Sequence, residues 1–281
     1  DYSAISKSIN VTLNGSTNST VQITDYSNDT IKNIENVIGS SDDDIIIGDS
    51  GKNTLDGSAG NDTLSGSGGN DVLIGGSGID IADYSNAGKG IIVNLKDAIE
   101  VSQDGFDTTD NLDGIEVIIG SDYQDNMTGS DNDDTLYGGA GSDTISGGLG
   151  ADDLQGYGLS TGTDSHLDTV SYAYVGSADE VTVDLSAGSG QVDVSGNISD
   201  TDTLSGFENV IGGDGADNIT GSSVANIIKA GSGADIIIGG DEADDLQGEA
   251  GNDTFIATSV NDGVDTIDGG ADSDTVDYSV L

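Results

Sequence analysis

Acidic residues recur at a fixed spacing along this chain, and the chemistry they could provide is the binding of a cation by oxygen ligands. Within nine-residue units such as GSAGNDTLS, which begins at Gly57, the sixth position is Asp or Asn. These sixth-position residues are Asp44, Asn53, Asp62, Asp71, Asp80, Asp125, Asp134, Asp143, Asp152, Asp217, Asn226, Asp235, Asp244, Asp253 and Asp274. Neighbouring carboxylates repel by about 1 kcal/mol at 4 Å in water and by about 4 kcal/mol at an effective dielectric of 20. A hard divalent cation would remove this repulsion, and an all-oxygen ligand set favours calcium over zinc or copper.

The units are arranged in three blocks separated by spacers. We expect spacer coils at 1–38, 84–119 and 171–211, and repeat blocks at 39–83, 120–170 and 212–277. The second block contains an insertion at 156–168, and residues 278–281 start a further repeat. Two phrases mark a longer period: Asp-Tyr-Ser at residues 1, 83 and 277, and Ile/Phe-Glu-x-Val/Ile-Ile-Gly before each block. This pattern suggests a segment of a longer array.

Each nonapeptide can supply one short strand. Its last three residues have strand character and its eighth residue is apolar, as at Ile46, Leu55 and Leu64. Because strand side chains alternate between faces, the eighth residue points inward while its neighbours point outward. Helix is disfavoured, since glycine costs roughly 1 kcal/mol per helical position and recurs every few residues. The pattern therefore predicts an all-β fold, a right-handed parallel β-roll or β-solenoid of stacked nonapeptides with two units per coil.

The composition excludes several classes of protein. The 281 residues include 52 acidic and 6 basic ones, a formal charge of −46 that repels nucleic acid and anionic membrane surfaces. No apolar run approaches the roughly 18 residues that a membrane span needs, so we expect no membrane insertion. Cysteine is absent, which excludes disulfides and zinc–thiolate sites. Charge and composition alone would also fit disorder, but the regular repeat argues for a structure that forms when its charge is neutralised.

The repeats resemble the calcium-binding nonapeptides of RTX (repeats-in-toxin) proteins, with the consensus Gly-Gly-x-Gly-x-Asp-x-apolar-x. GSAGNDTLS and GGAGSDTIS carry the resemblance, which extends over all three blocks. It implies a parallel β-roll with Ca²⁺ ions between loops. The Asp at position six and the carbonyls of positions two and four would face one ion, and the carbonyls of positions one, three and five the next. Carried onto this chain, the carbonyl ligands are those of Gly57, Ser58, Ala59, Gly60, Asn61, Ser67, Gly69, Gly76, Gly78, Gly139, Gly141, Gly148, Gly150, Gly231, Gly233, Glu249 and Gly251.

Some loops depart from the consensus. Asn53 and Asn226 offer a neutral oxygen, and the loop residues Asp42, Asp122, Tyr123, Asp131, Val224 and Glu242 replace expected ones. The first loop of each block has a spacer on one side, so we expect it to bind calcium weakly or not at all.

Two signals look catalytic. The segment GLSTG at 158–162 fits the pattern GxSxG, and the single histidine, His166, follows it. That motif needs a strand–turn–helix context, whereas here it lies in an insertion of a Gly/Ser-rich chain, so we interpret it as a surface loop. Adjacent acids such as Asp152 and Asp153 could mimic glycosidase carboxylates, but a ligand beside an outward-facing strand residue explains them better. We therefore expect no catalytic residues and no enzyme.

Taken with the resemblance, these observations predict a calcium-dependent structural or adhesive region of a protein secreted to the bacterial cell surface by type I secretion, S-layer-like or adhesin-like. Its partners would be calcium and either further copies of itself in a surface lattice or cell-surface glycans. Two alternatives stay open. One is an accessory module of a secreted polysaccharide-modifying enzyme, protease or lipase, and the other is the repeat region of an RTX toxin.

Overall fold

All regular secondary structure in the described residues is β-strand. The computed structural model describes residues 1–96, 101–158, 166–194, 197–258 and 263–279, and the side chains of 191–200 are not described either. Twenty-nine strands and no helix lie within these ranges. Accordingly, these residues contain no helix long and apolar enough to cross a membrane. The all-β class predicted from the sequence is confirmed.

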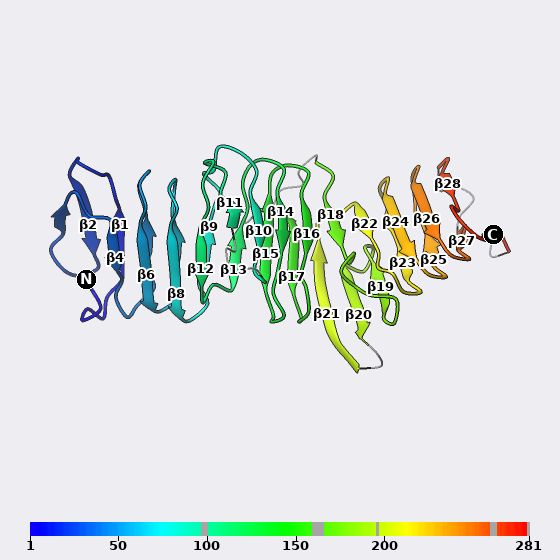
Figure 1. The fold of residues 1–281 in the computed structure, drawn as a ribbon, viewed down its shortest axis with the longest axis horizontal. Coiled ribbons are helices and arrows are strands. Elements are labelled where there is room, and N and C mark those ends of the chain that lie inside the picture. Colours follow the sequence, from blue (N-terminus) through cyan, green and yellow to red (C-terminus); the bar gives the residue numbers. More distant parts are fainter. Residues whose placement is uncertain (97–100, 159–165, 195–196, 259–262, 280–281) are drawn as a thin grey trace. The chain divides into compact units, whose positions relative to one another are not determined.

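The strands belong to two units, described separately. Unit 1 comprises Asp1–Gly129 with Thr135–Gly141. Its strands are β1 (Ile9–Thr12), β2 (Ser19–Ile23), β3 (Asp29–Ile31), β4 (Asn36–Ile38), β5 (Ile45–Ile47), β6 (Thr54–Ala59), β7 (Thr63–Ser65), β8 (Val72–Ser77), β9 (Ile81–Asp83), β10 (Ile92–Asn94), β11 (Val101–Gln103), β12 (Asn111–Asp113), β13 (Val117–Ile119), β14 (Asn126–Thr128) and β15 (Thr135–Gly139). In sheet order they run β15-β13-β9-β7-β5-β1-β2-β3, β12-β8-β6-β4 and β11-β10-β14 (Figure 1).

Unit 2 comprises Ser130–Asp134, Ser142–Tyr157 and the described residues from 166 on. Its strands are β16 (Thr144–Ser146), β17 (Asp153–Tyr157), β18 (Thr169–Ser171), β19 (Glu180–Asp184), β20 (Ser189–Val194), β21 (Asn197–Ser205), β22 (Asn209–Ile211), β23 (Asn218–Thr220), β24 (Ile227–Ser232), β25 (Ile236–Ile238), β26 (Asp245–Ala250), β27 (Thr254–Ile256), β28 (Thr266–Asp268) and β29 (Thr275–Asp277). The sheet orders are β29-β27-β25-β23-β19-β20-β21-β17 and β16-β18-β22-β24-β26-β28.

Within the blocks, each strand pairs in parallel with the strand two nonapeptides further on. Leu55 of β6 aligns with Leu73 of β8, and Ile46 of β5 aligns with Leu64 of β7. Successive nonapeptides therefore alternate between two sheets, and two of them complete one coil. This register is the one that the nine-residue period predicted.

The core is a ladder of single side chains. From Ile46 to Phe255, the eighth-position residues of the nonapeptides are at most 3% exposed. The residues on either side of them in the strand are half-buried, such as Thr54 and Asp56 around Leu55, or exposed, such as Ile45 before Ile46. One large apolar side chain per strand is a thin core, so hydrogen bonds and electrostatics in the loops carry much of the cohesion between coils.

The spacers contain antiparallel strands, which the sequence interpretation did not include. In the first spacer β1, β2 and β3 form an antiparallel sheet, and in the third β19, β20 and β21 do the same. In the second, β10 pairs with β11. The β20–β21 hairpin extends past the ends of the neighbouring strands of its sheet (Figure 1). The first strand of each spacer also pairs in parallel with the block that follows, as β1 does with β5.

Candidate metal-binding loops

The sixth-position acids of one sheet form a hydrogen-bonded ladder. The amide of Asp44 donates to Oδ1 of Asp62 at 2.7 Å, and the amide of Asp62 donates to Oδ1 of Asp80 at 2.8 Å. The same step of 18 residues joins Asn53 to Asp71, and Asp217 to Asp235. One carboxylate oxygen of each acid is thus fixed by the previous coil, and the stack of acids expected from the sequence is present.

The second carboxylate oxygen divides the loops into two classes. In what we call the closed loops, this oxygen accepts the amide of position two of the same loop. Asp44 is the clearest example, because Oδ2 accepts the Ser40 amide while Oδ1 accepts the Ser40 hydroxyl and the Ile9 amide. The other closed loops end in Asn53, Asp125, Asp134, Asp217 and Asn226. These are the first two loops of each block, and their carboxylates or amides are satisfied by the protein.

The two asparagines use both ends of their amides. Asn53 accepts the Asp49 amide on Oδ1 and donates Nδ2 to the carbonyl of Glu35 at 3.1 Å. Asn226 likewise accepts from Ser222 and donates to the carbonyl of Glu208. A carboxylate could not make the second bond, because it has no hydrogen to donate. Asparagine at this position therefore ties the second loop of a block to the spacer before it.

The remaining loops, which we call the open loops, differ in backbone conformation. Their second and fourth residues have positive φ, for example Ser58 at 79° and Gly60 at 120°. The open loops end in Asp62, Asp71, Asp80, Asp143, Asp152, Asp235, Asp244, Asp253 and Asp274, whereas neither position has positive φ in any closed loop. Every carbonyl ligand at positions two and four that the sequence predicted belongs to an open loop.

Stacking of the open loops requires glycine at its closest approaches. A Cβ at Gly78, where φ is +148°, would lie 1.9 Å from the carbonyl oxygen of Gly60 one coil earlier. Backbone therefore approaches backbone between successive loops, and the carbonyl groups come close to the next loop without intervening side chains.

In six of the nine open loops the second carboxylate oxygen is buried without a hydrogen-bond donor. These are the loops that end in Asp62, Asp71, Asp80, Asp152, Asp235 and Asp253. A buried charged oxygen without a partner is costly, and the sites recur at the spacing of the coils. Burial, followed by the charges of neighbouring acids, raises the pKa of Asp62 to about 6 and those of Asp71 and Asp235 to about 7.

The donor set of an open loop fits a calcium ion. It offers one carboxylate oxygen that lacks a donor, together with the backbone carbonyls of the loop, and all of these are oxygen ligands of the kind that Ca²⁺ accepts. In the part of the chain that the structure describes, no group of three or more His, Cys, Asp or Glu side chains could hold a metal ion. A cation at these loops would therefore depend on carbonyls together with a single acid per loop.

The ladder ends on spacer acids that the sequence interpretation missed. Asp71 donates its amide to Asp110, and Asp80 donates to Glu116. In unit 2 the acceptors are the spacer acids Asp202 and Glu208, together with Asp168 of the insertion in the second block and Asp265 of the last coil. The phrase Ile/Phe-Glu before each block was a signal for Glu116 and Glu208, and Asp110 and Asp202 each stand six residues before that Glu.

Two of these spacer acids accept a hydrogen bond from a buried tyrosine. Tyr84, which is 3% exposed, donates its hydroxyl to Oδ2 of Asp110 at 3.0 Å. Tyr172 is fully buried and donates to Oδ2 of Asp202 at 2.8 Å. The Tyr of the Asp-Tyr-Ser phrase, or of its degenerate copy Ser171-Tyr172-Ala173, therefore supplies the hydrogen bond that the second oxygen lacks in the open loops.

Two further candidate groups came from the sequence. Ser160 of GLSTG lies outside the described residues, and His166 is exposed. Asp153 follows Asp152 as the half-buried first residue of β17, as expected for an outward-facing strand residue.

Comparison with known families agrees with this geometry. The family model for the RTX calcium-binding nonapeptide repeat (4 copies) matches residues 34–64, 47–82, 119–154, 202–223, 220–255 and 259–278, which together cover more than half of the chain. A comparison with curated proteins finds no match. The parallel register of two nonapeptides per coil, the stacked acids and this match lead to one conclusion: the chain belongs to the RTX calcium-binding nonapeptide repeat family.

Proposed function

We propose that this chain is a calcium-dependent structural or adhesive region of a secreted bacterial cell-surface protein, S-layer-like or adhesin-like, without catalytic activity of its own. The observation that carries the proposal is the buried carboxylate oxygen without a donor in the open loops, repeated coil after coil. An array with a formal charge of −46 needs cations to stay folded. The repeats therefore act as a scaffold that becomes rigid only where calcium is plentiful.

In this proposal the ions are held by the open loops. Their ligands are the sixth-position acids, such as Asp62 and Asp71, with carbonyls of the loop residues, such as Ser58 and Gly60. Calcium supplies positive charge that neutralises the acid ladder. The closed loops bind calcium weakly or not at all, because the protein already satisfies their sixth-position side chains.

The proposal accounts for folding after export. Extracellular calcium sites have dissociation constants of about 10⁻⁴ to 10⁻³ M, so they are empty in the cytoplasm and filled outside the cell. A chain of this composition would be expanded without the ion, and would form its coils where the ion is abundant.

A calcium titration tests the proposal. The chain, stripped with a chelator, is titrated with calcium and followed by far-UV circular dichroism and hydrodynamic radius. We expect an expanded chain to become compact and rich in β-structure near millimolar calcium, whereas magnesium, which demands a smaller octahedral site, has little effect. A chain that is already compact without calcium and unchanged by it would refute the proposal.

A matched pair of variants localises the sites. Asp62→Asn keeps an oxygen for the Asp44 amide but removes the charge from an open loop. We expect it to weaken calcium binding at that loop by about tenfold or more, because charged ligands set affinity in such sites. Asp44→Asn changes a closed loop and should leave calcium affinity nearly unchanged. Isothermal titration calorimetry distinguishes the two, and equal losses in both variants would contradict the division into open and closed loops.

A further inference from the structure

The open loop that ends in Asp80 lies against a spacer rather than against another nonapeptide. Its second and fourth residues, Gly76 and Gly78, have positive φ, and Asp80 is fully buried with its Oδ2 lacking a donor. The next coil on this side presents the short turn Gly114-Ile115-Glu116 in place of a six-residue loop. Whatever meets the Asp80 oxygen on this side must therefore involve the spacer.

The spacer turn brings its first carbonyl to the place that the next nonapeptide occupies inside the block. A Cβ at Gly75 would lie 2.0 Å from the carbonyl oxygen of Gly114. Inside the block, a Cβ at Gly39 would lie 2.5 Å from the carbonyl oxygen of Gly57. The same Cβ at Gly75 would lie 2.6 Å from Oδ2 of Asp80. A carbonyl oxygen and a carboxylate oxygen thus flank one glycine, and neither can donate a hydrogen bond to the other.

Glu116 contributes a second acid at the same place. Its Oε2 accepts the Asp80 amide at 2.9 Å, while the amides of Glu116 and Val117 donate to the Asp80 carbonyl. These bonds fix the turn against the loop. The other oxygen of Glu116, Oε1, accepts no hydrogen bond from the described residues, and the residue is half-buried. Two carboxylates are therefore held together with water partly excluded.

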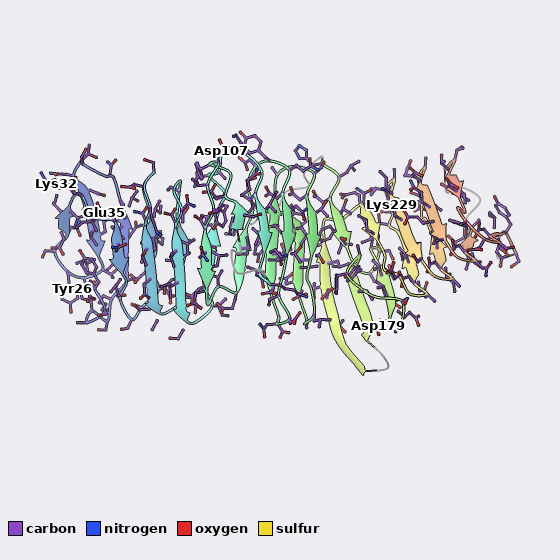
Figure 2. The ribbon with its side chains drawn as sticks, viewed as in Figure 1. Tyr26, Lys32, Glu35, Asp107, Asp179 and Lys229 are labelled. Atoms are coloured by element: carbon purple, nitrogen blue, oxygen red, sulfur yellow. The ribbon has the colours of Figure 1, made fainter. Side chains whose placement is uncertain are left out.

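Among the described residues, no lysine forms an ion pair with either acid. Lys7 pairs with Asp25, and Lys89 pairs with Asp107. Figure 2 shows Lys32 among the strands at the blue end of unit 1. Neighbouring carboxylates repel each other, so this junction needs a cation that the chain itself does not supply.

The opposite side of the first block closes in another way. There the spacer acid Asp110 accepts the Asp71 amide with one oxygen and the Tyr84 hydroxyl with the other. Glu116 has the same role toward the Asp80 amide, but its second oxygen receives no such donor within the described residues. The two sides of the block thus differ in what their spacer acids still lack.

We propose that the turn Gly114–Glu116 completes a calcium site with the open loop Gly75–Asp80. Water fills what remains of the six to eight positions that Ca²⁺ takes. The proposal rests on the calcium binding proposed above for the open loops, and it adds two spacer residues that the nonapeptide pattern does not assign. The ligands are the carbonyls of Gly76, Gly78 and Gly114, Oδ2 of Asp80 and the carboxylate of Glu116.

This site differs from one between two nonapeptides in its ligands. The short turn has no counterparts to loop positions three and five, so two carbonyls are lost and one carboxylate is gained. Because ligand charge raises affinity for Ca²⁺, the ion at the junction is held at least as tightly as one inside the block. It ties the spacer to the block on the side that has no tyrosine.

A crystal structure of the full chain grown in calcium tests the site directly. Anomalous scattering at long wavelength locates Ca²⁺, and we expect a peak between Asp80 and Gly114 as well as one beside Asp62. A peak beside Asp62 with water alone at the junction would overturn this site and leave the proposed function intact.

Glu116→Gln tests the spacer acid in solution, since it keeps an acceptor for the Asp80 amide and removes the charge. In calorimetric titrations we expect the affinity for one calcium ion to fall by about tenfold or more, with the circular dichroism spectrum in saturating calcium unchanged. Asp113→Asn removes the same charge from an exposed residue of the same spacer and should leave every affinity unchanged. Equal losses in both variants would show that Glu116 acts through net charge alone, against the proposal.

Counting the bound ions separates this site from the others. Equilibrium dialysis with radioactive calcium, at the concentration that just saturates the wild type, should show one ion fewer in the double variant Asp80→Asn, Glu116→Gln. An unchanged count there, together with a loss in Asp62→Asn, would overturn the junction site alone. A chain that neither binds calcium nor folds in it would overturn the proposed function and this site together.

Discussion

The two oxygens of a sixth-position carboxylate have different surroundings, and the second one distinguishes an open loop from a spacer acid. In open loops such as that of Asp62, this oxygen is buried without a donor, whereas on Asp110 it accepts the Tyr84 hydroxyl. The tyrosine thus supplies a donor to an oxygen that has none in the open loops. If the open loops bind calcium as proposed, a hydrogen bond takes the place of metal coordination where the sequence changes from nonapeptides to spacer.

Removal of that hydroxyl should therefore weaken the junction. Tyr84→Phe leaves a buried oxygen of Asp110 without its donor, and we expect a loss of about 1–3 kcal/mol in the free energy of unfolding. The measurement is urea unfolding in saturating calcium. Tyr2→Phe is the matched control, because Tyr2 donates to Asp29, which is exposed, and its loss should cost much less. Equal losses of unfolding free energy in the two variants would show that the buried hydrogen bond stabilises the fold no more than the exposed one.

At the scale of the residue, the sequence predicted that the sixth-position acids stack, but not which groups their second oxygens contact. The period placed every sixth-position acid in the ladder, because stacking follows from repetition. It could not separate Asp44 from Asp62, which occupy equivalent positions in their units. Their difference depends on whether a spacer or another nonapeptide forms the preceding coil. It is expressed in the backbone conformation at positions two and four of the loop.

At the scale of the element, the end of each spacer is a shortened turn. A residue with positive φ, such as Gly114 or Gly206, is followed two positions later by Glu116 or Glu208. A nonapeptide loop has room to bring an Asp to the amide of the previous coil. The shorter turn reaches the same amide with the longer side chain of glutamate, which explains why the phrase before each block contains Glu.

This explanation predicts a dependence on side-chain length. Glu116→Asp, shorter by one methylene, should lose the bond to the Asp80 amide, which is now 2.9 Å long. We expect hydrogen exchange at that amide to accelerate about tenfold, given about 1.5 kcal/mol for a hydrogen bond to a charged group. Glu116→Gln keeps the length and an acceptor and should retain most of the protection. Faster exchange in the Gln variant than in the Asp variant would contradict the argument.

The strand pairing of the blocks was predictable from the sequence, and that of the spacers was predictable only in part. Nine-residue repetition with one apolar residue per unit leaves little choice but parallel stacking, and the observed pairing of Leu55 with Leu73 agrees. In a spacer, alternation at Ile91–Leu95 predicts a strand but not its neighbour. The antiparallel partner β11 is the short segment Val-Ser-Gln, which has too little pattern to be recognised.

For the whole molecule, the acid ladder links folding to pH as well as to calcium. In the absence of the ion, burial raises the pKa of Asp71 and Asp235 from 3.8 to about 7. The folded state then binds protons more readily than the unfolded one. Their contribution to stability is fully present below pH 3.8 and is lost as the pH rises through about 7.

Acid should accordingly replace part of the effect of calcium. In chelator, lowering the pH from about 7.5 to about 5 should increase β-structure, since protons neutralise the buried acids and reduce the net charge. Far-UV circular dichroism across this range measures the effect, and Asp71→Asn should make the dependence shallower. A chain whose β-content falls or stays constant as the pH is lowered would show that the buried acids do not govern folding.

The assignment of two nonapeptides to each coil also restricts how such a gene can change in length. Duplication or deletion of 18 residues adds or removes one coil and leaves every later strand in its own sheet, with each ladder bond intact. Gain or loss of a single nonapeptide would move every later strand, those of the spacer included, to the opposite sheet. Glu116 and Asp110 would keep their partners, because both contact the last two loops of the block, which move with them. A change of nine residues therefore exchanges the two sheets for all later coils, and a change of 18 residues does not.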